Sequence, residues 1–420
     1  MKMNVKLNQV FETLSKKKTA LATLAVLFTF PLVTPSRYYM VLLSEVFIWA
    51  LLAMSYDLVL GYTGLVSFGH AALFGIGAYV SALLLRMNFP FLPAIFAAVL
   101  FGAILGLTMG IFSLRVSAIY YALVTLAFAE VIFAIFNKWV ELSGGETGLS
   151  VPRPDFLRST PFLIFALAIS VAIISILCIT AVRDLAKKGV HARNKIVYSV
   201  LMIGFLVLLV CTGPSKLHLI SEGPMKDRVI TISIMNIYYF LALMPLVLCY
   251  LVADRIVNSP MGRIFVAIRE NEERAKMLGY DVFKYRLISS TISGVFAGLA
   301  GSLYAPFALS INPANVLGSA VTINVLLYSI LGGLGTLIGP MIGAGIITLL
   351  ASELTRIPDI GQYWMLTLGI FYLLVILFLP YGIIVTWRLK GTTAKKTLKK
   401  LIESIKKSGR KEYAGEEGTP

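Results

Sequence analysis

The run FLPAIFAAVLFGAILGLTMGIFSL, from Phe91 to Leu114, contains no charged residue. A helix needs about 20 mostly apolar residues to cross the hydrocarbon core of a bilayer, and this run is long enough. The whole chain has the same character, because 58% of its 420 residues are hydrophobic and only 14% are charged. Soluble domains carry about 25% charged residues. We therefore expect an all-α protein that lies in a membrane.

Windows of this size predict a polytopic transmembrane helical bundle of about 10–12 spans. Four runs are short or glycine-rich, so some helices are expected to be broken or re-entrant; these four are Thr19–Thr34, Ile196–Cys211, Ala320–Leu337 and Ile338–Leu350. The other candidate spans are Tyr38–Leu60, Gly69–Leu85, Phe91–Leu114, Ile119–Phe136, Phe162–Val182, Ile232–Val252, Leu287–Ala308 and Tyr363–Val385.

Charge predicts the orientation of these spans. If the N-terminus is cytoplasmic and the sides alternate, about three quarters of the 37 Lys and Arg residues fall in inner segments, as the positive-inside rule requires. Both termini are then cytoplasmic in a multi-pass cell-membrane protein. The domains expected are a cytoplasmic segment 1–18, a permease domain 19–388 and a basic cytoplasmic tail 389–420. The tail is either an amphipathic helix on membrane lipid or a solvated extension.

Several function classes find no support in the residues. The net charge of +16 suits cytoplasmic loops of a membrane protein, and no nucleic-acid partner is expected. The three cysteines lie in apolar runs, and no Cys/His cluster indicates a metal. No GxxxxGK[ST], HExxH or Ser/His nucleophile motif occurs, so we expect neither an enzyme nor a bound cofactor.

The longest charged interruption is GRIFVAIRENEERAKMLGYDVFKYR, from Gly262 to Arg286. Met261, Ile264, Phe265 and Ile268 have the spacing of an amphipathic helix, and Ala275 and Leu278 extend that stripe. Gly279 stands where a helix C-cap is expected. One interpretation is one or two short helices on the membrane surface, with charged groups for a partner protein; the other is a solvated loop helix without a partner.

Two glycine patterns lie in candidate spans. GYTGLVSFGH carries Gly61, Gly64 and Gly69, and LGGLGTLIGPMIGA carries Gly332, Gly335 and Gly339. They indicate either broken helices that line a pathway or close helix packing, and their similarity suggests an internal repeat. Pro340 is expected to end or kink the preceding helix.

Ionisable residues in the spans are costly and should face the bundle interior or a wet cavity. Glu45, Asp57, His70 and Glu130 are the four. Glu130 is the preferred functional carboxylate, either touching the substrate ammonium or bonding to a neighbouring helix. His70 is more readily a packing or capping residue than a ligand.

The segment Gly262–Ala305 resembles the coupling-loop region of the permeases of branched-chain amino acid ABC transporters, of the LivM type. GYTGLVSFGHAALFGIGAY, YYALVTLAFAEVIF with LSGGETGLS, and LGGLGTLIGPMIGA resemble further signatures of that family, in the family's order. An apolar pair of runs within residues 160–213 departs from the family pattern and is expected to be an inserted helical hairpin of unassigned role.

The resemblance implies one permease subunit of an ATP-driven importer that moves branched-chain or related hydrophobic amino acids by alternating access. Its implied partners are a second permease of the LivH type, two ABC ATPase subunits that bind ATP and Mg, and an extracytoplasmic solute-binding protein. Within a coupling loop at 255–286, the ATPase-coupling residues would be Arg269, Glu270, Asn271, Glu272, Ala275, Leu278 and Gly279. The translocation-pathway candidates are Gly61, Thr63, Gly64, Ser67, Gly69, His70, Glu130, Gly332, Gly333, Gly335, Gly339 and Pro340.

Three alternatives remain open from the sequence. An ABC permease for urea, amides or another small solute would share these features. An ion-coupled secondary transporter would need intramembrane carboxylates, for which Asp57 and Glu130 are the candidates. A membrane-embedded enzyme is the third, without a supporting motif.

Overall fold

The computed structural model describes residues 37–115, 118–154, 226–357, 363–378, 382–384 and 386, with the side chains of the first helical turns after 226 left undescribed up to 237. The predicted segment 1–18, the tail 389–420 and the hairpin 160–213 lie outside the described residues. So do the candidate spans Thr19–Thr34, Phe162–Val182 and Ile196–Cys211.

Helices make up nearly all of the described chain. In order, the elements are α2 (Arg37–Asp57), the π-helical turn η1 (Leu58–Tyr62), α3 (His70–Arg86), α4 (Phe91–Ser113), α5 (Ala118–Lys138), α6 (Val140–Ser143), the 3-10 turn η2 (Gly145–Thr147), β1 (Leu149–Ser150), α9 (Lys226–Val257), α10 (Pro260–Glu270), α11 (Glu272–Met277), α12 (Val282–Ala308), β2 (Ser310–Ile311), α13 (Pro313–Val316), α14 (Ser319–Gly332), α15 (Ile338–Leu354) and α16 (Trp364–Phe378).

The predicted polytopic all-α architecture is confirmed. Within the described residues, six helical segments are long and apolar enough to cross a membrane: Tyr38–Tyr62, Phe91–Ser113, Tyr120–Lys138, Tyr238–Val257, Val282–Ala308 and Pro313–Gly332. Three shorter apolar helices, in α3, α15 and α16, correspond to the remaining predicted runs in the described part of the chain.

The chain divides into two compact units. One comprises Met1–Glu45 and Pro152–Pro245, and the other comprises Val46–Val151 and Leu246–Pro420. The second unit holds every glycine motif and the charged loop, and the contacts described below all lie within it.

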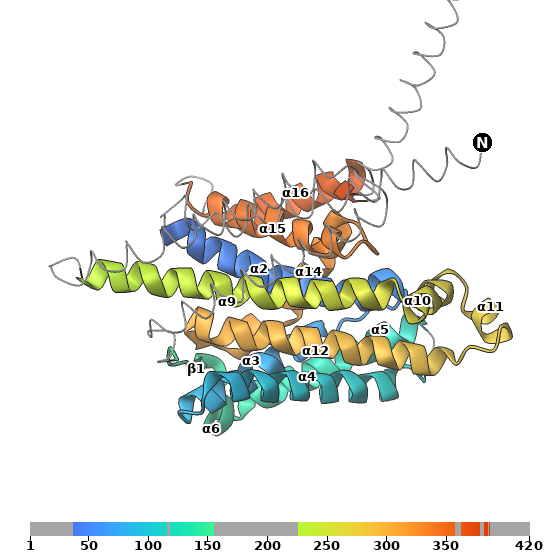
Figure 1. Ribbon diagram of the computed structural model, residues 1–420, viewed down its shortest axis with the longest axis horizontal. Coiled ribbons are helices and arrows are strands. Elements are labelled where there is room, and N and C mark those ends of the chain that lie inside the picture. The colour runs from blue at the N-terminus through green and yellow to red at the C-terminus, as the bar shows by residue number, and fades with distance from the viewer. Residues whose placement is uncertain are drawn as a thin grey trace, which may run out of the picture. The chain divides into compact units, whose positions relative to one another are not determined.

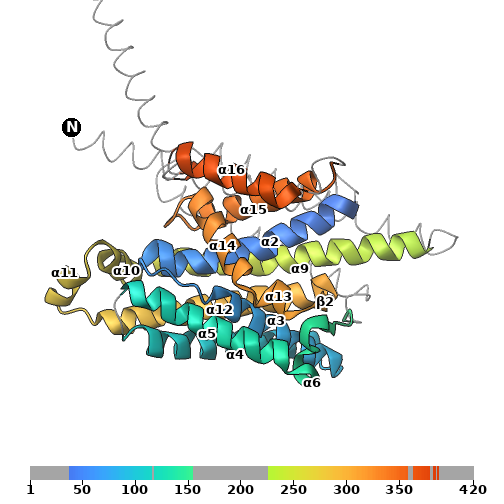
Figure 2. The same ribbon diagram turned by 180° about the vertical axis from the view of Figure 1, so that it is seen from behind.

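Glycines bring three helices of this unit into backbone contact. A Cβ added to Gly294 of α12 would lie 2.3 Å from the carbonyl oxygen of Gly102 in α4, and one added to Gly77 of α3 would lie 2.2 Å from the carbonyl oxygen of Gly298. Small residues allow this approach, which is a main source of helix association in a bilayer. Figures 1 and 2 show α4 running alongside α12 in both views.

A short strand pair closes one end of the unit, away from α10 and α11 (Figure 1). Leu149 of β1 pairs with Ile311 of β2 in antiparallel register, and the amide of Val151 donates to the carbonyl of Leu309 at 2.8 Å. The GGETG segment before β1 forms an ordered turn in which Gly144, Gly145 and Gly148 have positive φ. This end is therefore held by backbone hydrogen bonds between the segment that follows α6 and the segment that follows α12.

Candidate functional site

The first glycine motif lies at a break between α2 and α3. After Asp57 the helix widens into the π-helical turn Leu58–Tyr62, and the chain then leaves helical geometry until α3 begins at His70. Gly64 has φ +74°, a left-handed conformation that favours glycine. The Thr63 hydroxyl donates to the carbonyl of Val59 at 2.6 Å. The expected broken helix is thus present, and its unpaired backbone groups need other partners.

Hydroxyl side chains from three other helices supply those partners. Ser289 Oγ donates to the Leu58 carbonyl at 3.0 Å, Thr125 Oγ1 accepts from the Phe68 amide at 3.1 Å, and Thr322 Oγ1 accepts from the Ala71 amide at 2.8 Å. All three side chains are buried. Non-helical backbone at membrane depth is tolerated when it is packed in protein in this way. The sequence analysis missed these residues, although a hydroxyl inside an apolar run was the available signal.

His70 begins α3 at the end of the break and is 1% exposed. Its Nε2 lies 2.8 Å from Ser293 Oγ, which in turn donates to the carbonyl of Ser55. The ring of Tyr56 meets the imidazole edge-on, with the ring centroids 4.5 Å apart. These contacts fit the packing interpretation of His70 and place it beside the break.

The second glycine motif forms a turn between α14 and α15. α14 ends at Gly332, and Gly333, Gly335 and Leu337 have φ of 109°, 73° and 52° before α15 starts at Ile338. Pro340 does not kink the preceding helix as expected. It lies in the first turn of α15, where its missing N–H costs no hydrogen bond.

Asp57 joins the two glycine motifs. Its carboxylate is completely buried, and Oδ1 accepts from the Gly335 amide at 2.7 Å while Oδ2 accepts from the Leu337 amide at 3.0 Å. The two motifs are therefore in contact through a charged side chain at the end of α2. Sequence reasoning had not placed Asp57 in the site.

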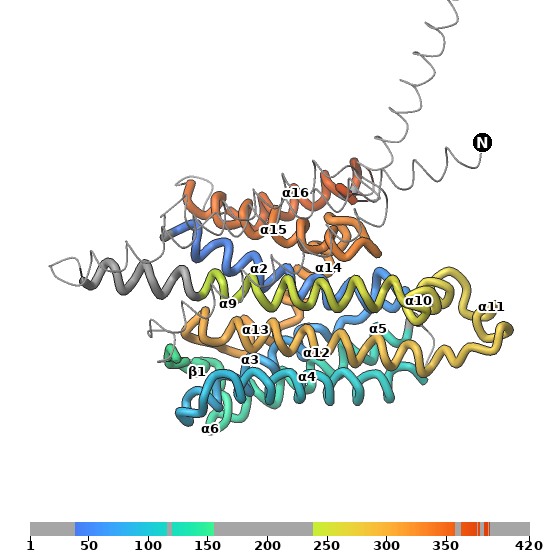
Figure 3. The backbone as a smooth tube through the Cα atoms, in the orientation of Figure 1, coloured from blue at the N-terminus to red at the C-terminus, as the bar shows by residue number. Residues whose placement is uncertain are grey.

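The charged loop between α9 and α12 is folded as two capped helices (Figure 3). Ser259 caps α10, Asn271 Oδ1 accepts from the Arg274 amide at 2.8 Å to cap α11, and Asp281 caps α12. Gly279 has φ +85° just after α11, and its amide donates to the Lys276 carbonyl at 2.9 Å. The predicted helix end at Gly279 is confirmed.

The apolar stripe of this loop mostly faces inward. Ile268, Ala275 and Val282 are buried together, with Ile264 and Tyr285 packed against them. Ala275 is only 1% exposed, so it belongs to the loop's own core and is not on the contact surface where it was expected. Leu278 also differs from the prediction, because it is exposed and does not extend the buried stripe.

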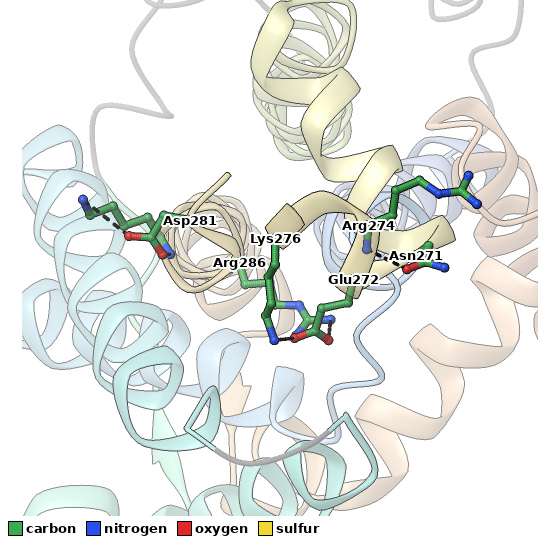
Figure 4. A network of polar contacts seen from close by, with 7 residues as sticks. Asn271, Glu272, Arg274, Lys276, Asp281 and Arg286 are labelled. Carbon is green, nitrogen blue, oxygen red and sulfur yellow. Dashed lines mark hydrogen bonds and ion pairs between the residues drawn. The ribbon is translucent and has the colours of Figure 1, made fainter. Parts of the chain in front are cut away.

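Glu272 fastens α11 to α12. Its Oε1 lies 2.7 Å from Lys276 Nζ, and its Oε2 lies 2.9 Å from Arg286 Nη2 (Figure 4). Burial acts to raise the pKa of the Glu272 carboxyl, but hydrogen bonds and charge from Lys276 and Arg286 outweigh it and lower the pKa below its usual value. Glu272 therefore holds the loop's shape and is not a free group on its surface.

The outer face of the loop combines apolar and polar side chains. Met277 is 85% exposed and Leu278 is 68% exposed at the end of α11, with Tyr280 exposed beside them. The exposed polar residues nearby are Arg269, Glu270, Asn271, Glu273, Arg274 and Lys276. Large apolar side chains clustered at a polar tip are a feature of protein contact sites.

Two predicted site residues lie elsewhere than expected. Arg269, at the end of α10, is exposed, but its Nη1 donates to the carbonyl oxygen of Gly61. Glu130 is exposed on α5, a span with few residues buried in this chain, and it is not brought together with the glycine motifs. The structure thus gathers Gly61, Gly64 and Gly335 around Arg269, while Glu130 stands apart.

Comparisons with known proteins agree with this architecture. The model of the permease component of branched-chain amino acid transport systems matches residues 38–379. The chain is 28% identical over 374 residues to the high-affinity branched-chain amino acid transport system permease protein LivM of Salmonella typhimurium, covering 89% of this chain and 76% of that protein. The protein of the same name from Escherichia coli is 29% identical over 339 residues, 80% of this chain and 68% of that protein.

A more distant relative carries a different name. The autoinducer 2 import system permease protein LsrC of Photorhabdus laumondii is 28% identical over 178 residues, 41% of this chain and 51% of that protein. No solved structure matches the chain. The chain is a multi-pass membrane protein without enzymatic activity of its own. Because the family model covers most of the sequence, this chain belongs to the family of permease components of branched-chain amino acid transport systems.

Proposed function

We propose that this chain is one of two permease subunits of an ATP-driven importer that moves branched-chain or related hydrophobic amino acids by alternating access. Its partners are a second permease of the LivH type, two ABC ATPase subunits and an extracytoplasmic solute-binding protein. ATP and Mg are bound by the ATPase subunits. The chain contributes the translocating helices and a surface through which the ATPases act.

The observation that carries this proposal is the loop between α9 and α12. Its two short helices are capped at each start, packed on their own core and fastened to α12 by Glu272 and Arg286. These contacts fix the conformation of the loop, and Met277 and Leu278 are exposed at its tip, where a partner protein can bind them. We assign ATPase docking to Glu270, Asn271, Leu278 and Gly279, and a bracing role to Glu272 and Ala275.

The orientation follows from the same assignment. With the loop at 255–286 on the cytoplasmic side, both termini are cytoplasmic and the strand pair β1–β2 faces the outside. The binding protein would then deliver its solute near the GGETG turn and β2. The glycine motifs around the break, with Thr63, Ser67 and His70, would lie on or beside the pathway.

The substrate class has one alternative of the same kind. The partial similarity to an autoinducer 2 permease keeps an importer for another small solute, such as urea or an amide, among the outcomes. An ion-coupled carrier is less well supported, because both oxygens of Asp57 are bound by backbone amides and Glu130 is separate from it.

Reconstitution tests the proposal directly. The chain is purified together with a LivH-type permease and two ABC ATPases from its own source, placed in proteoliposomes, and supplied with a solute-binding protein and labelled leucine. Uptake that requires ATP, and that excess isoleucine or valine abolishes, is the expected result. Uptake by the isolated chain without ATP would refute the importer assignment, and competition by urea or amides alone would change the substrate.

A further inference from the structure

The side chain of Arg269 extends from the end of α10 toward three glycines, Gly61, Gly64 and Gly335. Its Nη1 donates to the carbonyl oxygen of Gly61. Its stem crosses Gly64, where an added Cβ would lie 2.9 Å from Arg269 Cγ. On the other side, a Cβ added to Gly335 would lie 2.8 Å from Nη1. Glycine at positions 64 and 335 is therefore what makes room for the arginine.

Asp57 completes the arrangement from the bundle side. Its two oxygens hold the Gly335 and Leu337 amides, and a Cβ added to Gly61 would lie 2.0 Å from Asp57 Oδ1 and 2.5 Å from the Gly335 nitrogen. We call Asp57, Gly61, Arg269, Gly335 and Leu337 the glycine junction. The end of α2, the turn before α15 and the end of α10 all meet there.

The charged side chains of Asp57 and Arg269 make the hydrogen bonding of the glycine junction depend on the position of the coupling loop. A completely buried carboxylate requires compensating charge and hydrogen bonds. The amides of Gly335 and Leu337 provide the hydrogen bonds, and Arg269 brings a positive charge against Gly61 and Gly335. An arginine keeps its charge and presents several donors in a fixed plane, so it can contact a carbonyl and a turn together. When α10 moves, this charge and its hydrogen bond move with it.

We propose that Arg269 is a positioning residue that links the coupling loop to both glycine breaks, so that displacement of α10 changes how the end of α2 and the turn before α15 are held together. This inference rests on the proposed function and deepens it. Arg269 is exposed at the surface of the loop, and its Nη1 is at the same time bonded to Gly61. In this proposal, Arg269 passes to the membrane helices the movement that the outer face of the loop receives.

The test compares two arginines of α10 in the complete reconstituted transporter. Arg269→Gln removes the planar charge that bonds to Gly61, and Arg263→Gln removes the other arginine of the same helix, which is likewise exposed. The readouts are labelled leucine taken up and ATP hydrolysed by the same assembled complex. For Arg269→Gln we expect leucine moved per ATP to fall about tenfold, within the usual range of coupling between sites, while hydrolysis and subunit composition are retained. Arg263→Gln should keep the wild-type ratio.

A double variant and a conservative variant complete the design. If the two residues act through one junction, adding Arg269→Gln to Asp57→Asn should lower the ratio little further than Asp57→Asn alone. Arg269→Lys keeps the charge without the planar fork, and a reduced ratio is expected there too; it carries the test if Arg269→Gln does not assemble. An unchanged ratio in an assembled Arg269 variant, or fully additive losses, would overturn the inference. Absence of ATP-driven uptake in both wild type and Arg263→Gln would instead count against the proposed function.

Discussion

Replacing Gly61 by alanine should separate the two glycine motifs. The new methyl group would lie 2.0 Å from Asp57 Oδ1 and 2.5 Å from the Gly335 nitrogen, far inside van der Waals contact. The carboxylate must then withdraw from at least one of the two amides it now binds. A hydrogen bond to a charged group contributes about 1.5–3 kcal/mol, and an overpacked core costs about 1–3 kcal/mol. Because moving Asp57 relieves part of the clash, these terms overlap, and we expect a loss of about 2–4 kcal/mol in the free energy of unfolding.

Thermal unfolding of the purified chain in detergent, followed by tryptophan fluorescence and by loss of the monodisperse peak, measures this loss. Gly369→Ala is the matched control, because no atom lies within 4 Å of the added Cβ in α16. Alanine is favoured over glycine inside a helix, so the control should unfold at the wild-type temperature or slightly above it. Equal midpoints for Gly61→Ala and Gly369→Ala would refute the reasoning that Gly61 is fixed by Asp57 and Gly335.

Three further outcomes follow from the same contacts. Asp57→Asn leaves one oxygen to serve two amides, so the unfolding midpoint should fall by an amount equivalent to about 1–3 kcal/mol, and an unchanged midpoint would show that the second hydrogen bond contributes nothing. The folded-state pKa of Glu272 is lowered, so its ion pairs stabilise the loop at pH values above the usual glutamate pKa. This stabilisation is lost as the pH falls through the folded-state pKa. Limited proteolysis of the loop should therefore become faster at acid pH in the wild type, and it should depend less on pH in Glu272→Gln. Because the Leu278 side chain is exposed, Leu278→Asp should change the free energy of unfolding by no more than about 0.5 kcal/mol. The amount of ATPase that co-purifies should nevertheless fall. Full retention of the ATPase would show that Leu278 is not part of the docking surface.

The spans and the ends of the loop helices could be predicted from the sequence because they depend on local physics. Apolar length identifies a span such as Phe91–Leu114, and α4 occupies nearly the same residues. Gly279 carries the signal for a helix end and lies just after α11, whereas the caps Asn271 and Asp281 were not identified from the sequence. The glycine patterns likewise indicated breaks, and both fall between helices.

The partners across the bundle could not be predicted in the same way. Asp57 and Gly335 lie far apart in the chain, and nothing local indicates that one binds the other. The family resemblance implied that Arg269 and Ala275 contact the ATPase, yet Arg269 Nη1 bonds to Gly61 and Ala275 is buried. In a bilayer, both the lipid-facing and the packed sides of a helix are apolar, so periodicity did not reveal that Glu130 would be exposed on α5.

The backbone contacts among α3, α4 and α12 restrict how this protein can work. Where Gly77, Gly102, Gly294 and Gly298 let one main chain rest on another, neither a shift along the axis nor a rotation can occur without collision. We therefore expect these three helices to move together during transport. A residue larger than glycine at one of the crossings would push the helices apart without contacting any solute.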